Sequence, residues 1–293
     1  VLCYNTRLLC HYKGHPMIEI TTDSCCDLSP ELITKHQIRV INLNVFINGH
    51  DYKDGELTQA ELFALADESG ELPKTSAPSI SEFVNLFDTP NDKLFIGISA
   101  KLSATLQNAI KGAEMANQPV RVIDSMNLST GIGLLVLKAA ELRDQGRTVD
   151  EIKEIIERTV PYVRTAFVID TLDYLYKGGR CTAMQHVVGS MLRLRPVIEV
   201  RADGTLGVKE KIGGSRKKAL NSMLESFKRS LPGVDLHRVF VTHTSCEEDA
   251  EYLKTELLKL APIEEVCITE AGATIASHCG PNTIGILYIL KAE

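Results

Sequence analysis

Hydroxyl-bearing side chains gather in short turns that come just before expected helices. Thr75 and Ser76 stand in one such turn, and Ser99 and Ser103 bracket another. The first turn of a helix exposes backbone N–H groups and carries a partial positive charge, so it attracts anions. A single turn of this kind is more simply explained by N-capping, which Ser, Thr and Asp commonly do. Several of them in one chain, with Asp23-Ser24 as a further polar turn, favour an anion-binding site.

Two later segments carry groups that bind anions or move protons. Gly178-Gly179-Arg180 either cradles an anion, with Arg180 supplying the charge, or ends a helix and leaves the arginine on the surface. His278 stands beside Cys279 before the last expected strand. A lone histidine is more often structural, and adjacency in sequence does not make a catalytic dyad. A serine–histidine hydrolase is conceivable because Ser is plentiful, but the G-x-S-x-G motif is absent.

Composition and missing motifs argue against several other functions. The 32 Lys+Arg against 38 Asp+Glu give a formal charge of −6, which argues against a nucleic acid partner. The sequence contains no G-x-G-x-x-G, no G-x-x-x-x-G-K-[ST] and no H-E-x-x-H, so dinucleotide, P-loop and metalloprotease interpretations lack support. None of the 8 Cys forms a CxxC pair, and adjacent Cys25 and Cys26 fit the reduced thiols of a cytoplasmic protein. We therefore expect neither a cofactor nor a metal site.

The spacing of apolar and turn residues predicts an α/β fold with two domains. From residue 17 to about 165, strands alternate with helices, a pattern typical of a mostly parallel sheet flanked by helices. Beyond that point, Ala202-Asp203-Gly204-Thr205 between two apolar runs indicates a β-hairpin, and hence a mixed sheet with helices. The expected domains are therefore residues 17–165 and residues 166–293.

Residues 1–16 do not resemble the rest of the chain. Met17 opens a clean strand and has the character of a natural start, so we interpret residues 1–16 as a non-native leader. The leader is too short and too polar for a signal peptide or a membrane span, and no later apolar stretch reaches transmembrane length. The expected location is therefore cytoplasmic. As an alternative role, metal capture is open to the leader's Cys3, Cys10, His11 and His15.

Five motifs in order along the chain resemble those of the DegV family. Each is weak alone, but the five together, from Met17 to the last residues, are specific. The resemblance implies two α/β domains with one fatty acid buried at their junction, in a carrier that does no chemistry itself. It also implies a partner, a dihydroxyacetone-kinase-like fatty acid kinase that converts the bound acid to an acyl phosphate for phospholipid synthesis. The motifs are Thr22-Asp23-Ser24 with Asp27-Leu28, Lys74-Thr75-Ser76-Ala77-Pro78-Ser79, Ser99-Ala100-Lys101-Leu102-Ser103, Asp173-Tyr174-Leu175-Tyr176-Lys177-Gly178-Gly179-Arg180 and His278-Cys279-Gly280-Pro281.

The same resemblance implies which residues hold the carboxylate of the fatty acid. The family's carboxylate-binding positions fall on Thr75, Ser76, Ser99, Ser103 and His278. Supporting or partner-facing roles then fall to Asp23, Ser24, Arg180 and Arg216.

The sequence departs from the family pattern at three places. Ala100 stands where a second serine is usual, and Ala104 where a glycine is common. Relatives often carry an arginine where this chain has Gly213-Gly214, and Arg216 is the candidate substitute. Docking of the kinase is therefore less firmly implied than binding of the lipid.

The energetics of a long-chain acid such as palmitate, stearate or oleate fit this interpretation. About fourteen buried methylenes at about 0.8 kcal/mol each give about 11 kcal/mol of gross driving force, much of it offset by lost freedom on association. The carboxylate is the costly end, and hydroxyl donors with a neutral or protonated histidine would offset that cost. Apolar helices expected at 132–142 and 183–194 are candidates to line the tail. Transient membrane contact for lipid exchange is a further hypothesis.

Two other functions make different predictions about the same residues. A serine-hydrolase-like esterase requires a serine Oγ within hydrogen-bond reach of His278 and a third residue that orients the ring. A phosphate- or small-molecule-binding regulatory module requires a bound phosphate at Gly178-Gly179-Arg180 and no lipid.

Overall fold

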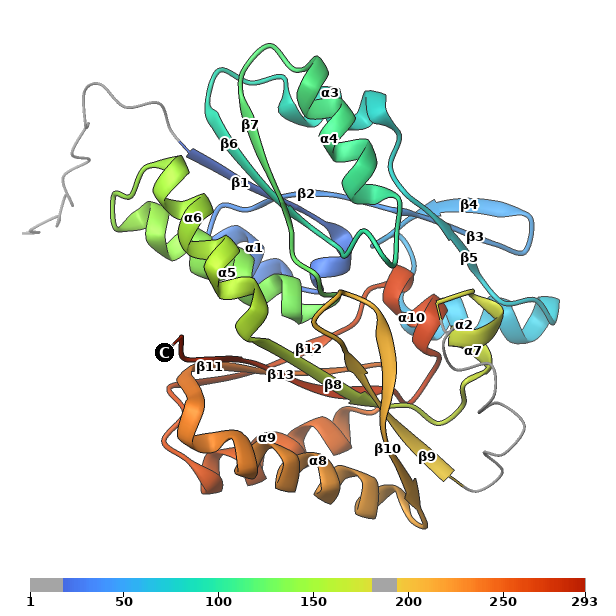
Figure 1. Cartoon of the computed structure of the whole chain (residues 1–293). Coiled ribbons are helices and arrows are strands. Elements are labelled where there is room, and N and C mark those ends of the chain that lie inside the picture. The colour runs from blue at the N-terminus through green and yellow to red at the C-terminus, as the bar shows by residue number, and fades with distance from the viewer. Residues whose placement is uncertain (1–17, 181–193, 293) are drawn as a thin grey trace, which may run out of the picture.

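The computed structural model describes residues 18–180 and 194–292. Its strands form a four-stranded sheet of order β2-β1-β6-β7, a three-stranded sheet of order β4-β3-β5 and a six-stranded sheet of order β10-β9-β8-β13-β11-β12 (Figure 1). The strands are β1 (Ile18–Asp23), β2 (Arg39–Ile41), β3 (Asn44–Ile47), β4 (His50–Lys53), β5 (Lys74–Ser76), β6 (Asp92–Gly97), β7 (Val120–Asp124), β8 (Val163–Val168), β9 (Leu194–Val200), β10 (Leu206–Gly213), β11 (Val234–His243), β12 (Glu265–Glu270) and β13 (Ile284–Leu290).

The helices begin where local signals in the sequence place them. Thr58 and Thr148 each form a complete capping box with the glutamate three residues on, and Ser29 caps a helix whose first residue is Pro30. The helices are α1 (Pro30–Lys35), α2 (Gln59–Ser69), α3 (Ile80–Phe87), α4 (Thr105–Met115), α5 (Thr130–Asp144), α6 (Val149–Thr159), α7 (Asp173–Lys177), α8 (Arg216–Ser230), α9 (Glu247–Leu260) and α10 (Ala273–Cys279).

The first sheet is parallel throughout and is covered on both faces, as the βα pattern predicts. Helices α3 and α4 pack on one face around Phe83, Phe87 and Phe95, whose rings contact one another edge-on or tilted. Helices α5 and α6 cover the other face. This layer forms the upper part of Figure 1.

The sheet of β3, β4 and β5 is antiparallel, and the sequence did not predict it as a separate unit. The apolar run from Ile38 to Ile47 is divided between β2 of the parallel sheet and β3 of this smaller one. Strand β5 carries Thr75, paired with Val45 of β3. The sequence analysis placed Thr75 and Ser76 in a turn, but they belong to β5, and the small sheet holds them in an extended conformation next to α10.

The third sheet is mixed, which confirms the prediction for the second half. The β9–β10 hairpin turns at Gly204, with φ of +80°, as the Asp203-Gly204 signal predicts. Strands β11 and β12 are parallel and the other pairs are antiparallel. Helices α8 and α9 cover one face, at the bottom of Figure 1. The expected domain boundary near residue 165 falls inside β8 and remains a prediction.

Helix α5 lies between the two large sheets and contacts both of them. Ten of its fifteen residues are buried, which explains why its sequence is apolar on all sides rather than on one stripe. Its first residues lie toward the junction where α10 lies, so two largely buried helices, α5 and α10, meet at the junction (Figure 1).

Segment 273–279 is helix α10, whereas the sequence analysis placed His278 simply in a segment before the last strand. Every residue of α10 except His278 is buried, and its alanines pack against Leu62 of α2 and Val45 of β3. His278 therefore lies in the last turn of a buried helix. The expected helix at 183–194 and the leader at 1–16 lie outside the described residues.

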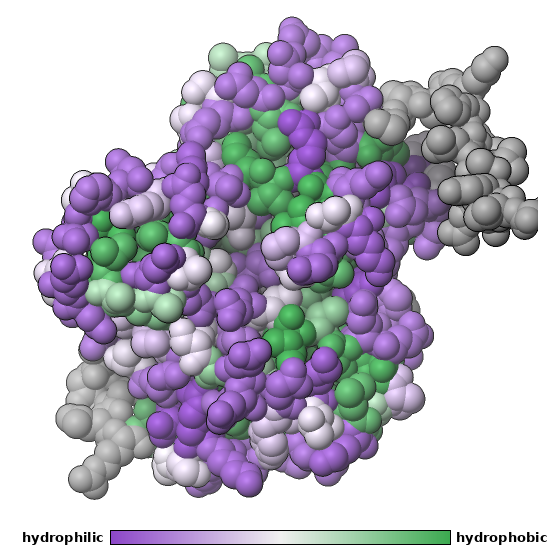
Figure 2. All heavy atoms as spheres, turned by 180° about the vertical axis from the view of Figure 1, so that it is seen from behind, coloured by the Kyte–Doolittle hydropathy of each residue, from purple (hydrophilic) through white to green (hydrophobic). Residues whose placement is uncertain are grey.

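The molecular surface is mainly hydrophilic on the face shown in Figure 2, where apolar residues form a few separate patches. Within residues 18–180 and 194–292, no helix combines the length and the apolar character needed to cross a membrane.

Candidate functional site

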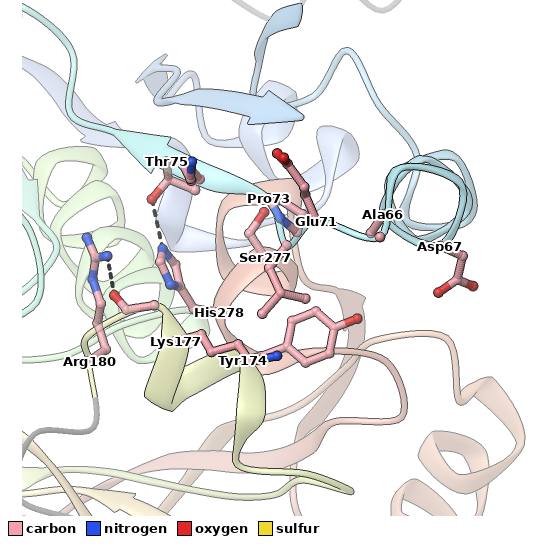
Figure 3. A pocket seen from close by; sticks show the side chains of 14 residues that line it. Ala66, Asp67, Glu71, Pro73, Thr75, Tyr174, Lys177, Arg180, Ser277 and His278 are labelled. Atoms are coloured by element: carbon pink, nitrogen blue, oxygen red, sulfur yellow. Dashed lines mark hydrogen bonds between the residues drawn. The ribbon is translucent and has the colours of Figure 1, made fainter. Parts of the chain in front are cut away.

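An open cleft of about 800 Å³ lies between α2, β5, α7 and α10 (Figure 3). Its walls carry both charged and apolar side chains, among them Asp67, Lys74, Tyr174 and Lys177. Thr75, Arg180 and His278 lie at its inner end, and the same three residues line a second, closed cavity of about 40 Å³ behind it. These three residues therefore stand at the boundary between a polar cleft and the interior.

Thr75 and His278 are brought together although 203 residues separate them in the sequence. Thr75 Oγ1 and His278 Nε2 lie 2.8 Å apart in a hydrogen bond, drawn as a dashed line in Figure 3. Strand β5 presents the threonine and the last turn of α10 presents the ring. Two of the predicted carboxylate-binding residues thus form one pair.

His278 is neutral in the ligand-free protein. Burial, and secondarily the positive charge of Arg180, lower the pKa of His278 to about 3. The protonated ring that the sequence analysis allowed concerns the complex with a carboxylate and remains a prediction. A neutral imidazole has one N–H, so Nε2 either donates to Thr75 Oγ1 or, when the proton is on Nδ1, accepts a hydrogen bond from it.

The position of that proton follows from the surroundings of the second ring nitrogen. His278 Nδ1 is buried and has no hydrogen-bond partner among the described residues. It faces Gly178, where an added Cβ would lie only 2.5 Å from it. A buried N–H without an acceptor costs about 1–3 kcal/mol, so we assign the proton to Nε2. The ring then donates to Thr75, whose own hydroxyl proton is left to donate elsewhere.

The closed cavity behind this pair is apolar apart from Arg180, His278 and a few hydroxyl groups. Ser103 lines it, with its hydroxyl 2.8 Å from that of Thr105. Thr274, one turn before His278 on the same helix, also lines it. Its remaining walls are mostly aliphatic: Leu43, Ile98, Leu102, Leu128, Leu175, Leu206, Ile275 and Cys279.

A further cavity of about 20 Å³ continues from the first and shares Leu128, Ile275 and Cys279 with it. Its lining includes several threonines, yet their hydroxyls are bonded to other groups. Thr242 bonds to Thr130 and Thr269, Thr244 donates to Gly280 O, and Thr283 donates to Cys279 O. With those hydroxyls satisfied elsewhere, the region is suited to an apolar ligand. Burial also raises the pKa of Cys279 to about 12, so its thiol stays protonated.

The Gly178-Gly179-Arg180 segment is a helix C-cap. Its three backbone N–H groups donate to carbonyls of Tyr174, Tyr176 and Leu175 at the end of α7. They are therefore not free to bind an anion, which favours the capping alternative of the sequence analysis. The Arg180 guanidinium bonds to the carbonyls of Leu102 and Gly178. No carboxylate of residues 18–180 or 194–292 forms an ion pair with it.

Ser76 and Ser99 do not line either closed cavity. Ser76 is exposed and accepts a hydrogen bond from Asn44 Nδ2 at 3.2 Å. Ser99 is fully buried and donates to Gly204 O of the β9–β10 hairpin at 2.9 Å. In this structure, the hydroxyl of Ser99 joins the parallel sheet to the hairpin, and its contact with a carboxylate remains a prediction.

Asp23 and Ser24 hold loops together near the junction. Asp23 accepts hydrogen bonds from the N–H groups of Cys25 and Ile98, at 3.0 and 2.8 Å, and burial raises its pKa to about 7. Ser24 donates to Asp54 Oδ2 at 2.8 Å and accepts from Leu43 N at 3.1 Å. Neither residue lines the cleft or the two closed cavities.

Asp27 of the same motif connects two helices. It accepts hydrogen bonds from Ser129 Oγ at the start of α5, at 2.6 Å, and from Gly272 N at the start of α10, at 2.8 Å. Ser129 directly precedes α5 without capping it, because its hydroxyl donates to Asp27. Asp27 thereby fixes the beginning of the helix that carries His278.

Arg216, the proposed substitute at Gly213-Gly214, lies in the second half of the chain. It forms ion pairs with Asp170 and Asp249 and donates to Asn282 O. Its guanidinium is largely engaged in connecting α8 to β8 and α9. A partner-facing role for Arg216 remains a prediction.

Among residues 18–180 and 194–292, no group of three or more His, Cys, Asp and Glu side chains is placed to hold a metal ion.

The sequence analysis did not identify Thr274 as a residue of the cavity wall. The only signal available was its spacing of four residues from His278, which has meaning once the segment is known to be helical.

The fold and site define a class: an α/β protein whose polar cleft leads, past a threonine–histidine pair, into an apolar interior. The chain belongs to the DegV family, because residues 17–291 match the family model described as an uncharacterised protein, DegV family. A DegV domain-containing protein of Caldanaerobacter subterraneus is 33% identical over 279 residues, covering 92% of this chain and 98% of that protein.

Solved structures of related proteins share the architecture. A DegV family protein from Thermus thermophilus, described by its fatty acid binding, has a TM-score of 0.87 at 32% identity and covers 94% of this chain and 100% of its own. DegV of Bacillus subtilis, described as a fatty acid binding protein, has a TM-score of 0.84 at 29% identity, with the same coverage. A family member from Ruminococcus gnavus, described with vaccenic acid, has a TM-score of 0.85 at 25% identity, again with 94% and 100% covered.

Proposed function

We propose that this protein binds one long-chain fatty acid, with its carboxylate at Thr75 and His278 and its tail in the apolar interior. The observation that carries the proposal is the position of this pair at the boundary between the open cleft and the closed cavity. An amphipathic acid has one charged end and one apolar end, and this boundary separates the two environments that the ends require. The fatty-acid-binding descriptions of the relatives support the same ligand.

The groups at the boundary can offset the cost of burying a carboxylate. Thr75, with its proton directed away from the ring, donates one hydrogen bond, and Ser103 supplies a second hydroxyl from the cavity wall. Hydrogen bonds to a charged group contribute about 1.5–3 kcal/mol each. Arg180 adds a half-buried positive charge without a carboxylate partner in the described part of the chain. Ser76, exposed on β5, and Ser99, bonded to Gly204 O in the ligand-free protein, stay in the set only as predictions from the family resemblance.

The tail must open the interior when it enters. The two closed cavities measure about 40 and 20 Å³, whereas pockets for small ligands typically measure about 300–1,000 Å³. The aliphatic side chains that line them therefore repack around the tail. Aliphatic walls impose little directional preference, so palmitate, stearate and oleate are all reasonable ligands.

A carrier fits the geometry better than a hydrolase does. The hydrolase alternative requires a serine at His278 and a third group that orients the ring, but Nε2 bonds to Thr75 and Nδ1 has no partner among the described residues. A histidine with a pKa near 3 is also a poor general base at neutral pH. The regulatory-module alternative is disfavoured because the N–H groups of the Gly178-Gly179 turn are already bonded.

The proposal includes a partner for the bound acid. The carboxylate would lie next to an open cleft, from which a dihydroxyacetone-kinase-like fatty acid kinase could reach it and form the acyl phosphate used for phospholipid synthesis. Lys74 and Lys177 in the cleft walls are suited to an approaching phosphate. Incubation of the loaded protein with such a kinase and ATP should yield acyl phosphate, and no product with an otherwise active kinase would refute this part.

Mass spectrometry of the purified protein tests the carrier function. Native spectra should show a one-to-one mass excess equal to a long-chain fatty acid, and organic extraction should release that acid. His278→Gln, which removes the ring but keeps a polar side chain, should reduce the loaded fraction. A ligand-free mass that stays unchanged after incubation with palmitate and oleate would reject the proposal.

A further inference from the structure

Thr274 has a hydroxyl group without a hydrogen-bond partner in a buried position. The residue is 3% exposed, and its Oγ1 finds no partner among the described residues. Buried hydroxyl groups are nearly always bonded, and an unbonded one costs about as much as a lost hydrogen bond. The threonines of the neighbouring cavity follow that rule, so Thr274 is an exception within one small region.

The position of Thr274 in its helix explains why it cannot satisfy itself. A helical threonine usually bonds to the carbonyl three or four residues earlier. Thr274 is only the second residue of α10, so residue 270 lies outside the helix, and Ala271 O already accepts from Gln59 Nε2 at 2.7 Å. Thr274 therefore lacks the carbonyl acceptor that a helical threonine normally uses.

Thr274 lies in the wall of the cavity that begins at the head-group pair. It lines the same closed cavity as Thr75, Ser103 and His278. It precedes His278 by four residues, which places both side chains on one face of α10, about one turn apart. A carboxylate has two oxygens that together accept about four hydrogen bonds, and Thr75 satisfies one of these.

We infer that Thr274 is a further carboxylate-binding residue, whose hydroxyl donates to the bound fatty acid. This inference rests on the proposed function and deepens it by adding a contact that the sequence motifs did not indicate. In the ligand-free protein the hydroxyl is buried without a partner, and in the complex it gains one. The group is therefore unfavourable for folding and favourable for binding.

Thr274→Val tests this inference because valine keeps the shape and removes the hydroxyl. In delipidated full-length protein, the variant should raise the melting temperature by about 2 °C. Its palmitate affinity, measured by calorimetry, should fall at least fivefold, and Thr274→Ser should restore most of that loss. A purely structural role would move stability and affinity in the same direction or leave affinity unchanged.

Thr21→Val is the matched control, since the buried Thr21 hydroxyl already donates to Leu94 O at 3.2 Å and the residue lines neither the cleft nor the two closed cavities. It should lower the melting temperature and change the affinity less than twofold. The carboxyl carbon of [1-¹³C]palmitate should also shift its NMR resonance between wild type and Thr274→Val. An unchanged affinity or an unchanged resonance would overturn the inference, whereas wild-type protein that binds no palmitate would instead refute the proposed function.

Discussion

Removal of the Thr75 hydroxyl should affect both the His278 ring and the binding of the carboxylate, and the two effects can be measured separately. Thr75→Val keeps the β-branched shape that suits a strand and deletes the group that lies 2.8 Å from His278 Nε2. The variant ring then has no partner on either nitrogen, because Nδ1 already lacks one among the described residues. The change therefore acts on the ring and on any ligand that the threonine holds.

The structure sets the size of both effects. An unpaired imidazole N–H costs about 1–3 kcal/mol, and Thr75 is only half-buried, so we expect the lower end of that range. About 1 kcal/mol corresponds to a fall of roughly 2–4 °C in the melting temperature of the ligand-free protein. Loss of a hydrogen bond to a charged carboxylate, about 1.5–3 kcal/mol, corresponds to roughly 10- to 150-fold weaker binding.

Calorimetric titration of delipidated protein with palmitate measures the second effect, and thermal unfolding measures the first. Thr75→Ser is the matched variant, since it retains the hydroxyl and should bind palmitate within a few-fold of wild type. Wild-type affinity in Thr75→Val, with wild-type protein binding palmitate normally, would show that the carboxylate is held elsewhere and would refute the assignment.

Three further perturbations follow from contacts described above. Gly178→Ala would place a Cβ 2.5 Å from His278 Nδ1 and should weaken palmitate binding at least tenfold. Gly213→Ala, whose added Cβ would lie 3.5 Å from Leu194 Cδ2, should leave the affinity unchanged. Burial raises the pKa of Asp23 from 3.8 to about 7. The stability that protonated Asp23 contributes is therefore complete below pH 4 and is lost as pH rises through 7. Asp23→Asn should remove up to about 1.4 kcal/mol per pH unit from the slope of the urea-unfolding free energy between pH 4 and 7. Asp27→Ala leaves Ser129 Oγ and Gly272 N unpaired and should cost about 2–5 kcal/mol in the same assay, and a loss below 0.5 kcal/mol would contradict the bridging role.

Local chemistry accounts for the elements that the sequence predicted well. The capping boxes at Thr58 and Thr148 and the hairpin turn at Gly204 depend on residues within four positions of each other. Such interactions act in any context, so they can be recognised without knowledge of the fold.

Distant contacts account for what the sequence did not predict. Helix α10 is short and built largely of small residues, and its start is held by Asp27, 245 residues away from Gly272. The antiparallel sheet of β3, β4 and β5 likewise joins strands that resemble continuations of a βα pattern. Neither element has a periodic apolar stripe of its own, because tertiary contacts decide its conformation.

The candidate site likewise contains residues that the sequence predicted and residues that only tertiary contacts reveal. Thr75 and His278 were expected from the resemblance to the DegV family, and the structure explains why they are a pair. Thr274 carries no motif, and its role depends on one missing hydrogen bond inside a cavity. The neutral state of His278 also depends on burial that no local pattern reveals.

The 203-residue separation between Thr75 and His278 has a consequence for protein synthesis. A ribosome adds about 5–20 residues per second, so roughly 10–40 s pass between the appearance of the threonine and that of the histidine. The amino-terminal layer can fold during that interval, yet its head-group position stays incomplete until α10 docks. Under the proposed function, the head-group position is complete only after His278 has left the ribosome, so a nascent chain stalled before that point should bind palmitate more weakly than the full-length protein.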